Sequence, residues 1–399
     1  MGATAPALAP PATPPATAVA TGGAGGRHQS VDIIRGLACV LMAIDHVRVY
    51  SGVPAGGPTP GVFFTRWVTH FVAPTFALLA GTSAYLLGRR LGDTGKLARF
   101  LVSRGALLVV LEMSFIRWSW AFHVNYAEFN LAGVIWMLGW CMILLGAMVR
   151  LRPVVVGWIG VGIVLFQQVF ALVPRALPEG MRGGFSYFWE FIYSSGFDAW
   201  PGIAILYVIV PWIGVMAAGY GFGLVLERPD VSRRRTLYRL GTVLTVVFLL
   251  AGSAFASRAG DGAPPFWVRL LNQQKYPASQ LFLMMTLGPM ILLMPWAERA
   301  RGPVARVLET FGRVPMFYYL AHILVIHSLS VLAMMVFTGG AFNSDWYSAA
   351  PYTGVPGIFR WSLSQLYLVY AVAMAALLPL CVWYARAKRD RPAWWMRYI

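Results

Sequence analysis

Charged side chains are scarce in this sequence, and their scarcity excludes an ordinary soluble domain. They make up 12% of the 399 residues, while hydrophobic residues make up 58%. Soluble domains carry about a quarter charged residues. Apolar runs recur along the chain, and a run of roughly 17 residues or more can cross a hydrocarbon core about 30 Å thick. The sequence therefore predicts an all-α, polytopic membrane helix bundle.

Cysteine is also rare. The three cysteines are Cys39, Cys141 and Cys381. Each lies in an apolar run, and their spacing fits neither a disulfide framework nor a zinc site. The chain also lacks a P-loop and a glycine-rich dinucleotide motif. We therefore expect neither a bound metal nor a permanently bound cofactor.

Acidic residues are few: 15 stand against 32 lysines and arginines, which gives a net charge of +17. Most basic residues lie in the termini and in the even-numbered connections between about ten predicted spans, so both termini are expected to be cytoplasmic. The excess charge reflects topology and contact with anionic lipid, and nucleic-acid binding is not expected. In a bacterium the host membrane would be the cytoplasmic one. The predicted spans are 31–50, 70–88, 103–121, 131–149, 153–173, 201–225, 239–257, 280–297, 315–336 and 365–385.

The chain is expected to form one domain after a short tail. Residues 1–26 are rich in Ala, Pro, Thr and Gly and hold no lysine or arginine. A signal peptide needs a basic start and an unbroken apolar core, and this stretch has neither. We expect residues 1–27 to be a disordered cytoplasmic tail and residues 28–399 to be a single transmembrane domain.

The first predicted span is unusually polar, since it carries Asp32, Arg35, Asp45, His46 and Arg48. Arg35 and His46 lie about 16 Å apart along a helix, so Arg35 is expected near the inner surface and His46 near the outer one. The two aspartates can each pair with the arginine three residues later, which leaves His46 without a partner in its own helix. A histidine at this depth is either a general base facing the bundle interior or a structural group bonded to a neighbouring helix.

Other polar side chains fall at two depths. Glu112 is expected near the middle of the third span, where it needs a cation or donor from another helix, or must be protonated. His322 and His327 lie about 140° apart around the ninth span. They cannot share a metal on one face, and at least one is expected to be structural. The polar residues expected at the outer side include His70, Asn272, Lys275 and Tyr276.

Seven segments also occur in a recognisable order: VDIIRGLACVLMAIDHVR, THFVAPTFALLAGTSAYLLG, RGALLVVLEMSFIRW, VIWMLGWCMILLG, KYPASQLFLMMTLGP, FGRVPMFYYLAHILVIH and LPLCVWYARAKRDRPAWWMRYI. Together they resemble the prokaryotic proteins with a heparan-α-glucosaminide N-acetyltransferase catalytic-like domain, over about residues 28–399. The resemblance implies a transmembrane acyltransferase-like fold. It extends to a lysosomal enzyme and, more distantly, to membrane acyltransferases that modify sugars at the cell surface. In the latter, a first-helix Arg-Gly followed by a histidine is tied to catalysis; Arg35, Gly36 and His46 match this pattern.

One position departs from the lysosomal pattern. In that enzyme the proposed catalytic histidine lies in the loop after the first helix, and an asparagine stands at the end of that helix. Here His46 stands near the helix end, and residues 51–65 contain no histidine. His70 is the next candidate. We therefore predict that His46 or His70 is the catalytic base.

Acyl transfer from a thioester needs an anchor for the phosphates of coenzyme A, a path for the pantetheine arm and a base at the acceptor. Arg35, Arg99 and Arg104 are the predicted phosphate ligands. We expect an acyl group, most simply acetyl, to pass from cytoplasmic acyl-CoA, the co-substrate, to an amine or hydroxyl of a glycan or lipid-linked sugar outside. The predicted acceptor-binding residues are Asn272, Lys275, Tyr276 and Glu112.

A second class of protein fits the same buried ionisable residues. A proton-coupled transporter of a polar or lipid-linked solute would also keep them inside a membrane. A third reading, a scaffold without chemistry, explains them less well. Binding of acyl-CoA distinguishes the acyltransferase from both alternatives. The sequence leaves open the acceptor, the acyl length and whether the protein is a homodimer.

Overall fold

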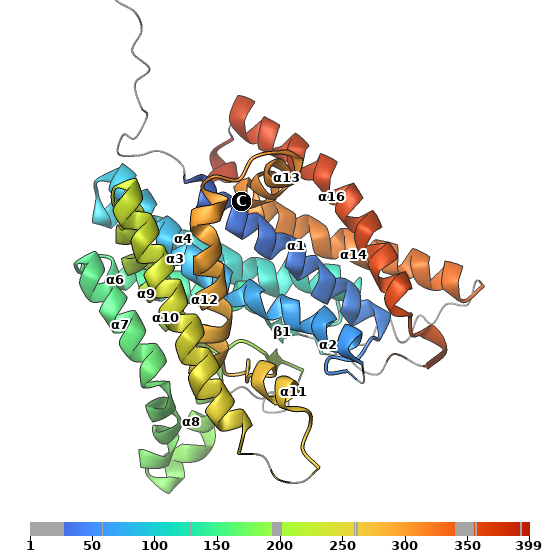
Figure 1. Ribbon diagram of the computed structural model, residues 1–399, viewed down its shortest axis with the longest axis horizontal. Helices are drawn as coiled ribbons and strands as arrows, with labels where there is room; N and C mark the ends of the chain where they lie inside the picture. The colour runs from blue at the N-terminus through green and yellow to red at the C-terminus, as the bar shows by residue number, and fades with distance from the viewer. Residues whose placement is uncertain are drawn as a thin grey trace, which may run out of the picture.

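The structure is a computed structural model (Figure 1). The described residues are all except 1–27, 58, 128–129, 194–201, 259, 261, 340–354, 356 and 392. The expected tail at 1–27 therefore lies outside the described residues. The remainder is almost entirely helical, as predicted.

The helices of the first half of the chain are α1 (Gln29–Ser51), α2 (Pro60–Trp67), η1 (Val68–Phe71), α3 (Val72–Leu91), α4 (Thr94–Leu111), the π-helical turn η2 (Glu112–Ile116), α5 (Arg117–Ala121), α6 (Val134–Met148), α7 (Pro153–Leu165), η3 (Gln167–Leu172), η4 (Pro174–Ala176) and α8 (Glu179–Ile192). Those of the second half are α9 (Ile209–Leu226), α10 (Asp230–Ala256), α11 (Phe266–Leu271), α12 (Gln280–Ala297), α13 (Pro303–Arg313), α14 (Pro315–Phe337), η5 (Gly357–Phe359), α16 (Leu363–Asp390) and η6 (Trp394–Arg397). Two short strands, β1 (Leu131–Ala132) and β2 (Ala204–Ile205), pair in parallel.

Helix α1 runs through the middle of the molecule (Figure 1). It packs against α3, α12, α13, α14 and α16, and most of its residues are buried despite its charges. Its crossing with α13 is very close, because a Cβ on Gly36 would lie 1.8 Å from the Leu308 carbonyl oxygen. The glycine of the Arg-Gly pair therefore lets α13 reach α1, as small residues do where helices meet in membranes.

Several of the other helices pack against one another in pairs. Helix α9 packs between α3 and α7, α4 packs on α6, and α10 packs on α12. At the contact of α3 with α9, a Cβ on Gly81 would lie 1.9 Å from the Met216 carbonyl oxygen. Close backbone contact at small residues thus holds this half of the bundle together as well.

Six helices of the described part of the chain are long and apolar enough to cross a membrane, or seven if the bent pair α7 and η3–η4 counts as one span. This supports a polytopic all-α protein but does not by itself reach the expected ten. The other three predicted ranges coincide with α1, with α4 to α5, and with α6. Helix α6 has only 15 residues, and α1 and α4 are more charged than an ordinary membrane span.

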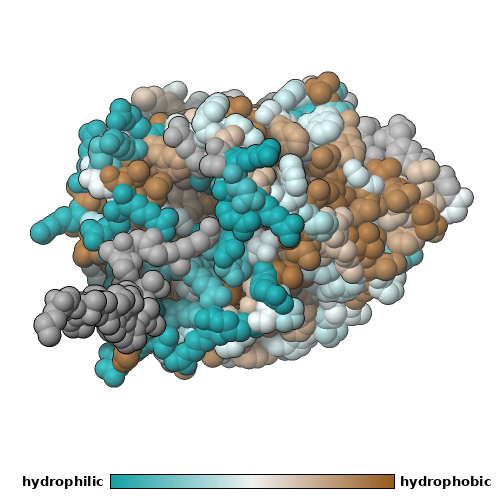
Figure 2. Space-filling model, turned by 90° about the horizontal axis from the view of Figure 1, so that it is seen from above, coloured by the Kyte–Doolittle hydropathy of each residue, from teal (hydrophilic) through white to brown (hydrophobic). Residues whose placement is uncertain are grey.

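Hydrophilic side chains gather at one end of the bundle. This is the end where α1 begins, where α13 lies and where the chain terminates (Figures 1 and 2). Arg35 lies in the first turns of α1 near this end, whereas Asp45 and His46 lie in its last turns. The start of α1 therefore lies at the hydrophilic end of the bundle, and its last turns lie away from that end.

Candidate functional site

A cavity of about 850 Å³ opens near the hydrophilic end, between α1, α3, α4, α6, α14 and the last residues of the chain. All three predicted phosphate ligands line it. Among the described residues, no aspartate or glutamate side chain lines it. The basic side chains of its wall are Arg35, Lys96, Arg99, Arg104, Arg313 and Lys388.

Arg35 is held in place by three helices. Its Nη2 donates to Ser83 Oγ of α3 at 2.7 Å, and its Nη1 donates to the Gly312 carbonyl of α13 at 3.1 Å. The predicted pair with Asp32 is confirmed at 3.3 Å. Arg35 is therefore a rigid cation at the cavity wall, because each bond fixes part of the planar guanidinium.

Arg104 has a different environment. Its Nε is buried without a hydrogen-bond partner, and the Phe100 ring lies 6.0 Å from its Cζ. Within the described residues neither Arg104 nor Arg99 forms an ion pair or side-chain hydrogen bond. Arg35 is close enough to act on Arg104 electrostatically. Two neighbouring cations with one left unpaired suit an anionic ligand, since burying an unpaired charge is unfavourable.

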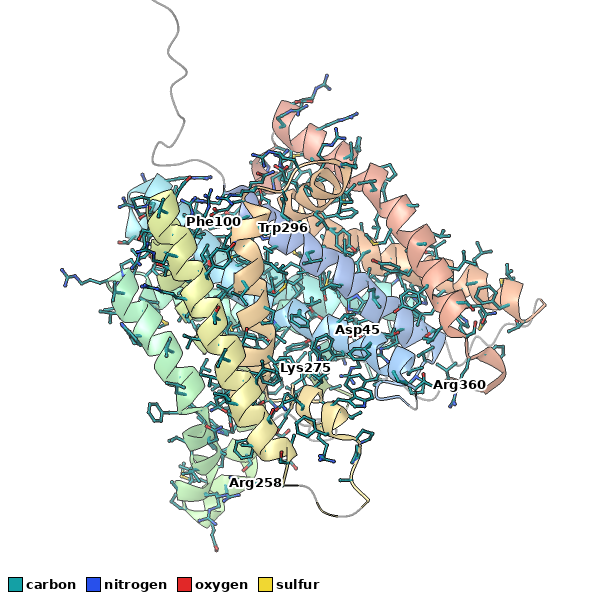
Figure 3. The ribbon with its side chains drawn as sticks, viewed as in Figure 1. Asp45, Phe100, Arg258, Lys275, Trp296 and Arg360 are labelled. Carbon is teal, nitrogen blue, oxygen red and sulfur yellow. The ribbon has the colours of Figure 1, made fainter. Side chains whose placement is uncertain are left out.

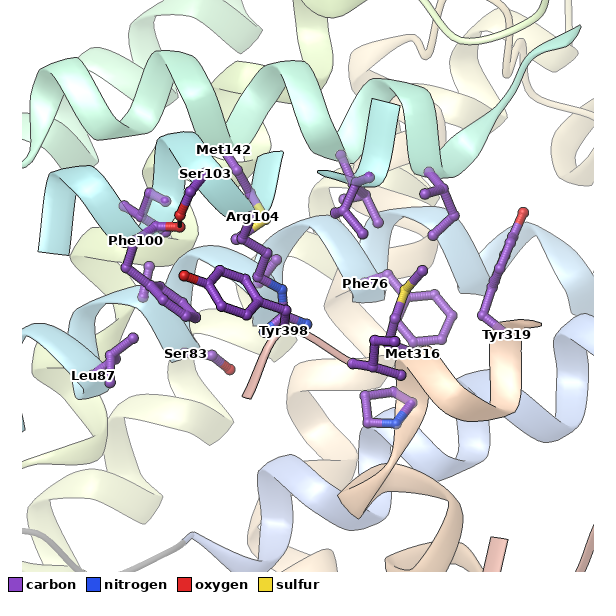
Figure 4. A pocket seen from close by; sticks show the side chains of 18 of the residues that line it. Phe76, Ser83, Leu87, Phe100, Ser103, Arg104, Met142, Met316, Tyr319 and Tyr398 are labelled. Carbon is purple, nitrogen blue, oxygen red and sulfur yellow. Dashed lines mark hydrogen bonds between the residues drawn. The ribbon is translucent and has the colours of Figure 1, made fainter. Parts of the chain in front are cut away.

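The cavity becomes apolar away from these arginines. Phe100 and Arg104 lie in one half of it, and Tyr319 lies at the far end of the other half (Figure 4). The apolar wall between them includes Phe76 and Met316. The cavity thus combines a cationic half with an apolar half, which matches a long ligand with phosphates at one end.

The far end of the cavity adjoins a pair of histidines. The Tyr319 ring lies 5.1 Å from the His322 ring, and the Tyr319 carbonyl lies 2.6 Å from His322 Nδ1. His322 Nε2 lies 2.6 Å from His46 Nδ1. His46 is therefore joined to a neighbouring helix, and its partner is His322 of α14. The sequence did not reveal this pair, because nothing in it indicates that positions so far apart meet.

The hydrogen bonds of this pair determine which ring nitrogens carry protons. A carbonyl only accepts, so Nδ1 of His322 must donate to Tyr319. In a neutral pair, Nε2 of His322 then accepts the Nδ1 proton of His46, which leaves Nε2 of His46 with a free lone pair. Within the described part of the chain, that Nε2 forms no hydrogen bond. His322 thus holds His46 in the tautomer that a general base requires.

The surroundings of the pair are aromatic. The Trp120 ring packs edge-on against His46 at 4.8 Å, and the Tyr50 hydroxyl donates to the Trp120 carbonyl at 2.9 Å. His327 Nδ1 lies 2.8 Å from the Ser119 carbonyl, and its ring stacks on Phe122. His327 therefore ties α14 to α5, in agreement with the expectation that one of the two histidines of this helix is structural.

His322→Ala is expected to lower kcat by about tenfold, the lower range for losing a partner that orients a functional histidine. The KM for acyl-CoA should stay unchanged. His322→Gln places an amide oxygen where Nε2 accepts the His46 proton, so it should restore most of the activity. Steady-state kinetics of both variants check this. Equal losses in the two variants would show that His322 serves packing alone.

Glu112 finds its donors on another helix, as predicted. Its Oε2 accepts from the backbone N–H groups of Ile135 and Trp136 at 3.1 and 3.2 Å. These are the second and third residues of α6, so Glu112 caps the start of that helix. The carboxyl group lies against Gly133, where a Cβ would come within 2.5 Å of Oε1. Glu112 therefore has a clear structural role, and its contact with an acceptor stays a prediction.

The other predicted outer residues come from separate elements. Lys275 is buried and lies over the rings of Tyr276 and Tyr207, at 5.2 and 5.6 Å. His70 is buried in η1, 5.5 Å from the Phe282 ring. Asn272 ends α11 with an exposed side chain. Neither His70 nor His46 lines the basic cavity.

In the described ranges, no three His, Cys, Asp or Glu side chains come together as a metal site would require. The predicted ion pair of Asp45 with Arg48 is confirmed at 2.9 Å.

Fold and site together define an all-α polytopic membrane protein whose basic cavity ends at Tyr319, beside the pair His322 and His46. The family model for the catalytic part of heparan-alpha-glucosaminide N-acetyltransferase matches residues 27–254, more than half of the chain. The chain belongs to this family, which confirms the resemblance seen in the sequence. A comparison with curated proteins found no match. The matched region contains Arg35, His46 and Arg104, whereas His322 and Lys275 lie beyond it.

Proposed function

We propose that this protein is a membrane acyltransferase that uses acyl-CoA, most simply acetyl-CoA, and acylates a sugar on the opposite side of the membrane. The observation that carries the proposal is the position of the basic cavity. It starts at Arg35, Arg99 and Arg104 and ends at Tyr319, whose ring and carbonyl both contact His322. The family membership supports the same class of reaction.

In this proposal the arginines bind the phosphates of coenzyme A. Arg104 and Arg35 supply charge-assisted hydrogen bonds, and the apolar half of the cavity holds the pantetheine arm. The rise of α1 between Arg35 and His46, about 16 Å, spans the distance from phosphates to thioester. The acyl carbon would then stand beyond Tyr319, beside His46.

The chemical step needs one base. His46 Nε2 accepts a proton from the amine or hydroxyl of the acceptor as that group attacks the thioester carbonyl carbon. The new C–N or C–O bond forms, the C–S bond breaks, and the thiolate leaves as coenzyme A after taking up a proton. His322 stabilises the imidazolium of His46 through the existing hydrogen bond, provided that its own ring stays neutral.

The proposed topology has ten spans, with both termini and the basic cavity mouth on the cytoplasmic side. Seven of these spans are long and apolar enough to cross a membrane. The other three are α1, the segment from α4 to α5, and α6. Charges inside α1 and α4 are compatible with crossing, because they face cavity or partner groups and not lipid.

Labelling with a membrane-impermeant thiol reagent tests this orientation. Cys39, Cys141 and Cys381 are buried and are replaced first. Single cysteines are then placed at Thr59 and Ser232, which are both exposed. In intact cells Thr59→Cys should react and Ser232→Cys should react only after permeabilisation. The reverse pattern would invert the orientation.

Transfer of labelled acetyl groups tests the function directly. The purified protein in detergent should bind acetyl-CoA and transfer its label to at least one member of a panel of amino sugars. Binding of acetyl-CoA without transfer to any sugar of the panel would indicate an acceptor outside the panel or slow hydrolysis of acetyl-CoA. A protein that binds no acyl-CoA, and that moves protons when reconstituted in vesicles, would be a transporter.

A further inference from the structure

A second cluster of unpaired cations lies near the reacting end of α1. Lys275 is only 8% exposed, and within the described residues no carboxylate lies within 4.0 Å of its Nζ. The rings of Tyr276 and Tyr207 contact the ammonium group through their faces. Such contacts stabilise the charge but accept none of its three N–H groups as a full hydrogen bond.

Arg66 and His70 add to this cluster from the neighbouring α2–η1 segment. Arg66 lies in the last turn of α2 and His70 in η1, four residues later. The Nε of Arg66 and the Nδ1 of His70 are both buried, and in the part of the chain that the structure describes neither has a hydrogen-bond partner. His70 is 5% exposed. Because the His70 ring packs on Phe282 of α12 and Phe64 of α2 stacks on Trp267 of α11, the α2–η1 segment borders the connection that carries Lys275.

The three side chains and the end of α1 act on one another electrostatically. The charges of Lys275 and Arg66 reach both Asp45 and His70. Asp45 is the acidic group that faces them, and it is already paired with Arg48. The cluster therefore holds an excess of two positive charges. In Figure 3, Asp45 and Lys275 lie in the same half of the bundle, far from Phe100 of the basic cavity.

We infer that this cluster, Arg66, His70 and Lys275, binds an anionic group of the acceptor: a phosphate, sulfate or carboxylate attached to the sugar. An oxyanion would take up the free N–H groups and neutralise the excess charge, which a neutral sugar cannot do. The inference rests on the proposed function for its location, because Lys275 also acts on His46. The acceptor would therefore be held by its anion while its amine or hydroxyl faces His46 Nε2.

The test compares neutral and anionic amino sugars. Acetyl transfer by the full-length protein in detergent is measured with glucosamine, glucosamine 6-phosphate and glucosamine 6-sulfate. We expect the KM for at least one anionic sugar to be tenfold or more below that for glucosamine. Lys275→Met and Arg66→Gln should raise that KM by roughly tenfold to hundredfold, the effect of losing a charge-assisted hydrogen bond, and should raise the KM for glucosamine much less.

Arg258→Gln is the matched control, since Arg258 is exposed and lies over Phe255, away from the cluster (Figure 3). Its KM values should equal those of the parent. Equal KM values for neutral and anionic sugars in the parent would overturn the inference, as would variants that raise both KM values alike. Retained acetyl-CoA binding shows that a variant is folded.

Direct binding separates this inference from the proposed reaction. The thermal midpoint of the parent should rise with glucosamine 6-phosphate or the 6-sulfate more than with glucosamine, and Lys275→Met should abolish the difference. This result would support the anion site even if no acetyl transfer were found. If inorganic phosphate alone raised the thermal midpoint, the occupant of the cluster would be a free anion, and the inference that it binds an anionic sugar would be wrong.

Discussion

His46→Ala should lower kcat by roughly 10²–10⁴, the usual contribution of general acid–base catalysis. The hydrogen bonds of the pair make His46 the base. His322 Nδ1 donates to the Tyr319 carbonyl, so His46 Nδ1 donates to His322 and His46 Nε2 is left to take a proton. Alanine removes this nitrogen but leaves the arginines of the cavity in place. Acetyl-CoA affinity should therefore be unchanged.

The measurement is transfer of labelled acetyl under saturating acetyl-CoA, with binding determined separately. His70→Ala is the comparison. If His70 only shapes the acceptor site, its loss should mainly raise the KM for the acceptor. Full activity in the His46 variant would end its assignment as the base, and complete loss in the His70 variant alone would transfer that role to His70.

Arg104→Ala is expected to weaken acetyl-CoA binding by roughly tenfold to 150-fold. This range corresponds to about 1.5–3 kcal/mol for a hydrogen bond to a charged group. The buried Nε of Arg104 is without a partner in the described residues, so its removal leaves no protein group unpaired. Thermal stability in detergent should consequently stay the same or rise slightly.

Titration calorimetry with acetyl-CoA measures the affinity, and thermal unfolding in detergent measures the stability. Arg150→Ala serves as the control, because Arg150 is exposed and does not line the cavity. Arg35→Ala should also weaken binding, yet it should lower stability, since Ser83 and the Gly312 carbonyl lose their donor. Unchanged affinity in the Arg104 variant would mean that coenzyme A does not occupy this cavity.

The sequence predicts those contacts that depend on local spacing. The pairs Asp32–Arg35 and Asp45–Arg48 follow from a helical separation of three residues, and both are present. The helical ranges also follow from apolar runs. Placement of Arg35, Arg99 and Arg104 on one cavity agrees with their expected common depth, because depth is set by position along each helix and not by which helices are neighbours.

Contacts between helices could not be predicted in the same way. The bond from His46 to His322 joins residues 276 positions apart, and apolar periodicity shows which face of a helix is buried but not which partner covers it. Lys275 was predicted near the acceptor. The sequence could not show that its ammonium group lies over the Tyr207 ring and has no carboxylate partner among the described residues, because Asp45 pairs with Arg48. The bonds of Arg35 to Ser83 of α3 and to the Gly312 carbonyl of α13 could not be predicted for the same reason.

The cap that Glu112 places on α6 also determines which way round a long ligand can enter. Val134 and Ile135, at the start of α6, line the cavity, and the exposed N–H groups of a helix start would ordinarily attract phosphate. Glu112 already accepts hydrogen bonds from two of them. The start of α6 is therefore an unfavourable place for the phosphate of a ligand. Under the proposed function, an elongated molecule with phosphates at one end should therefore enter in one orientation only, with its uncharged end leading toward Tyr319.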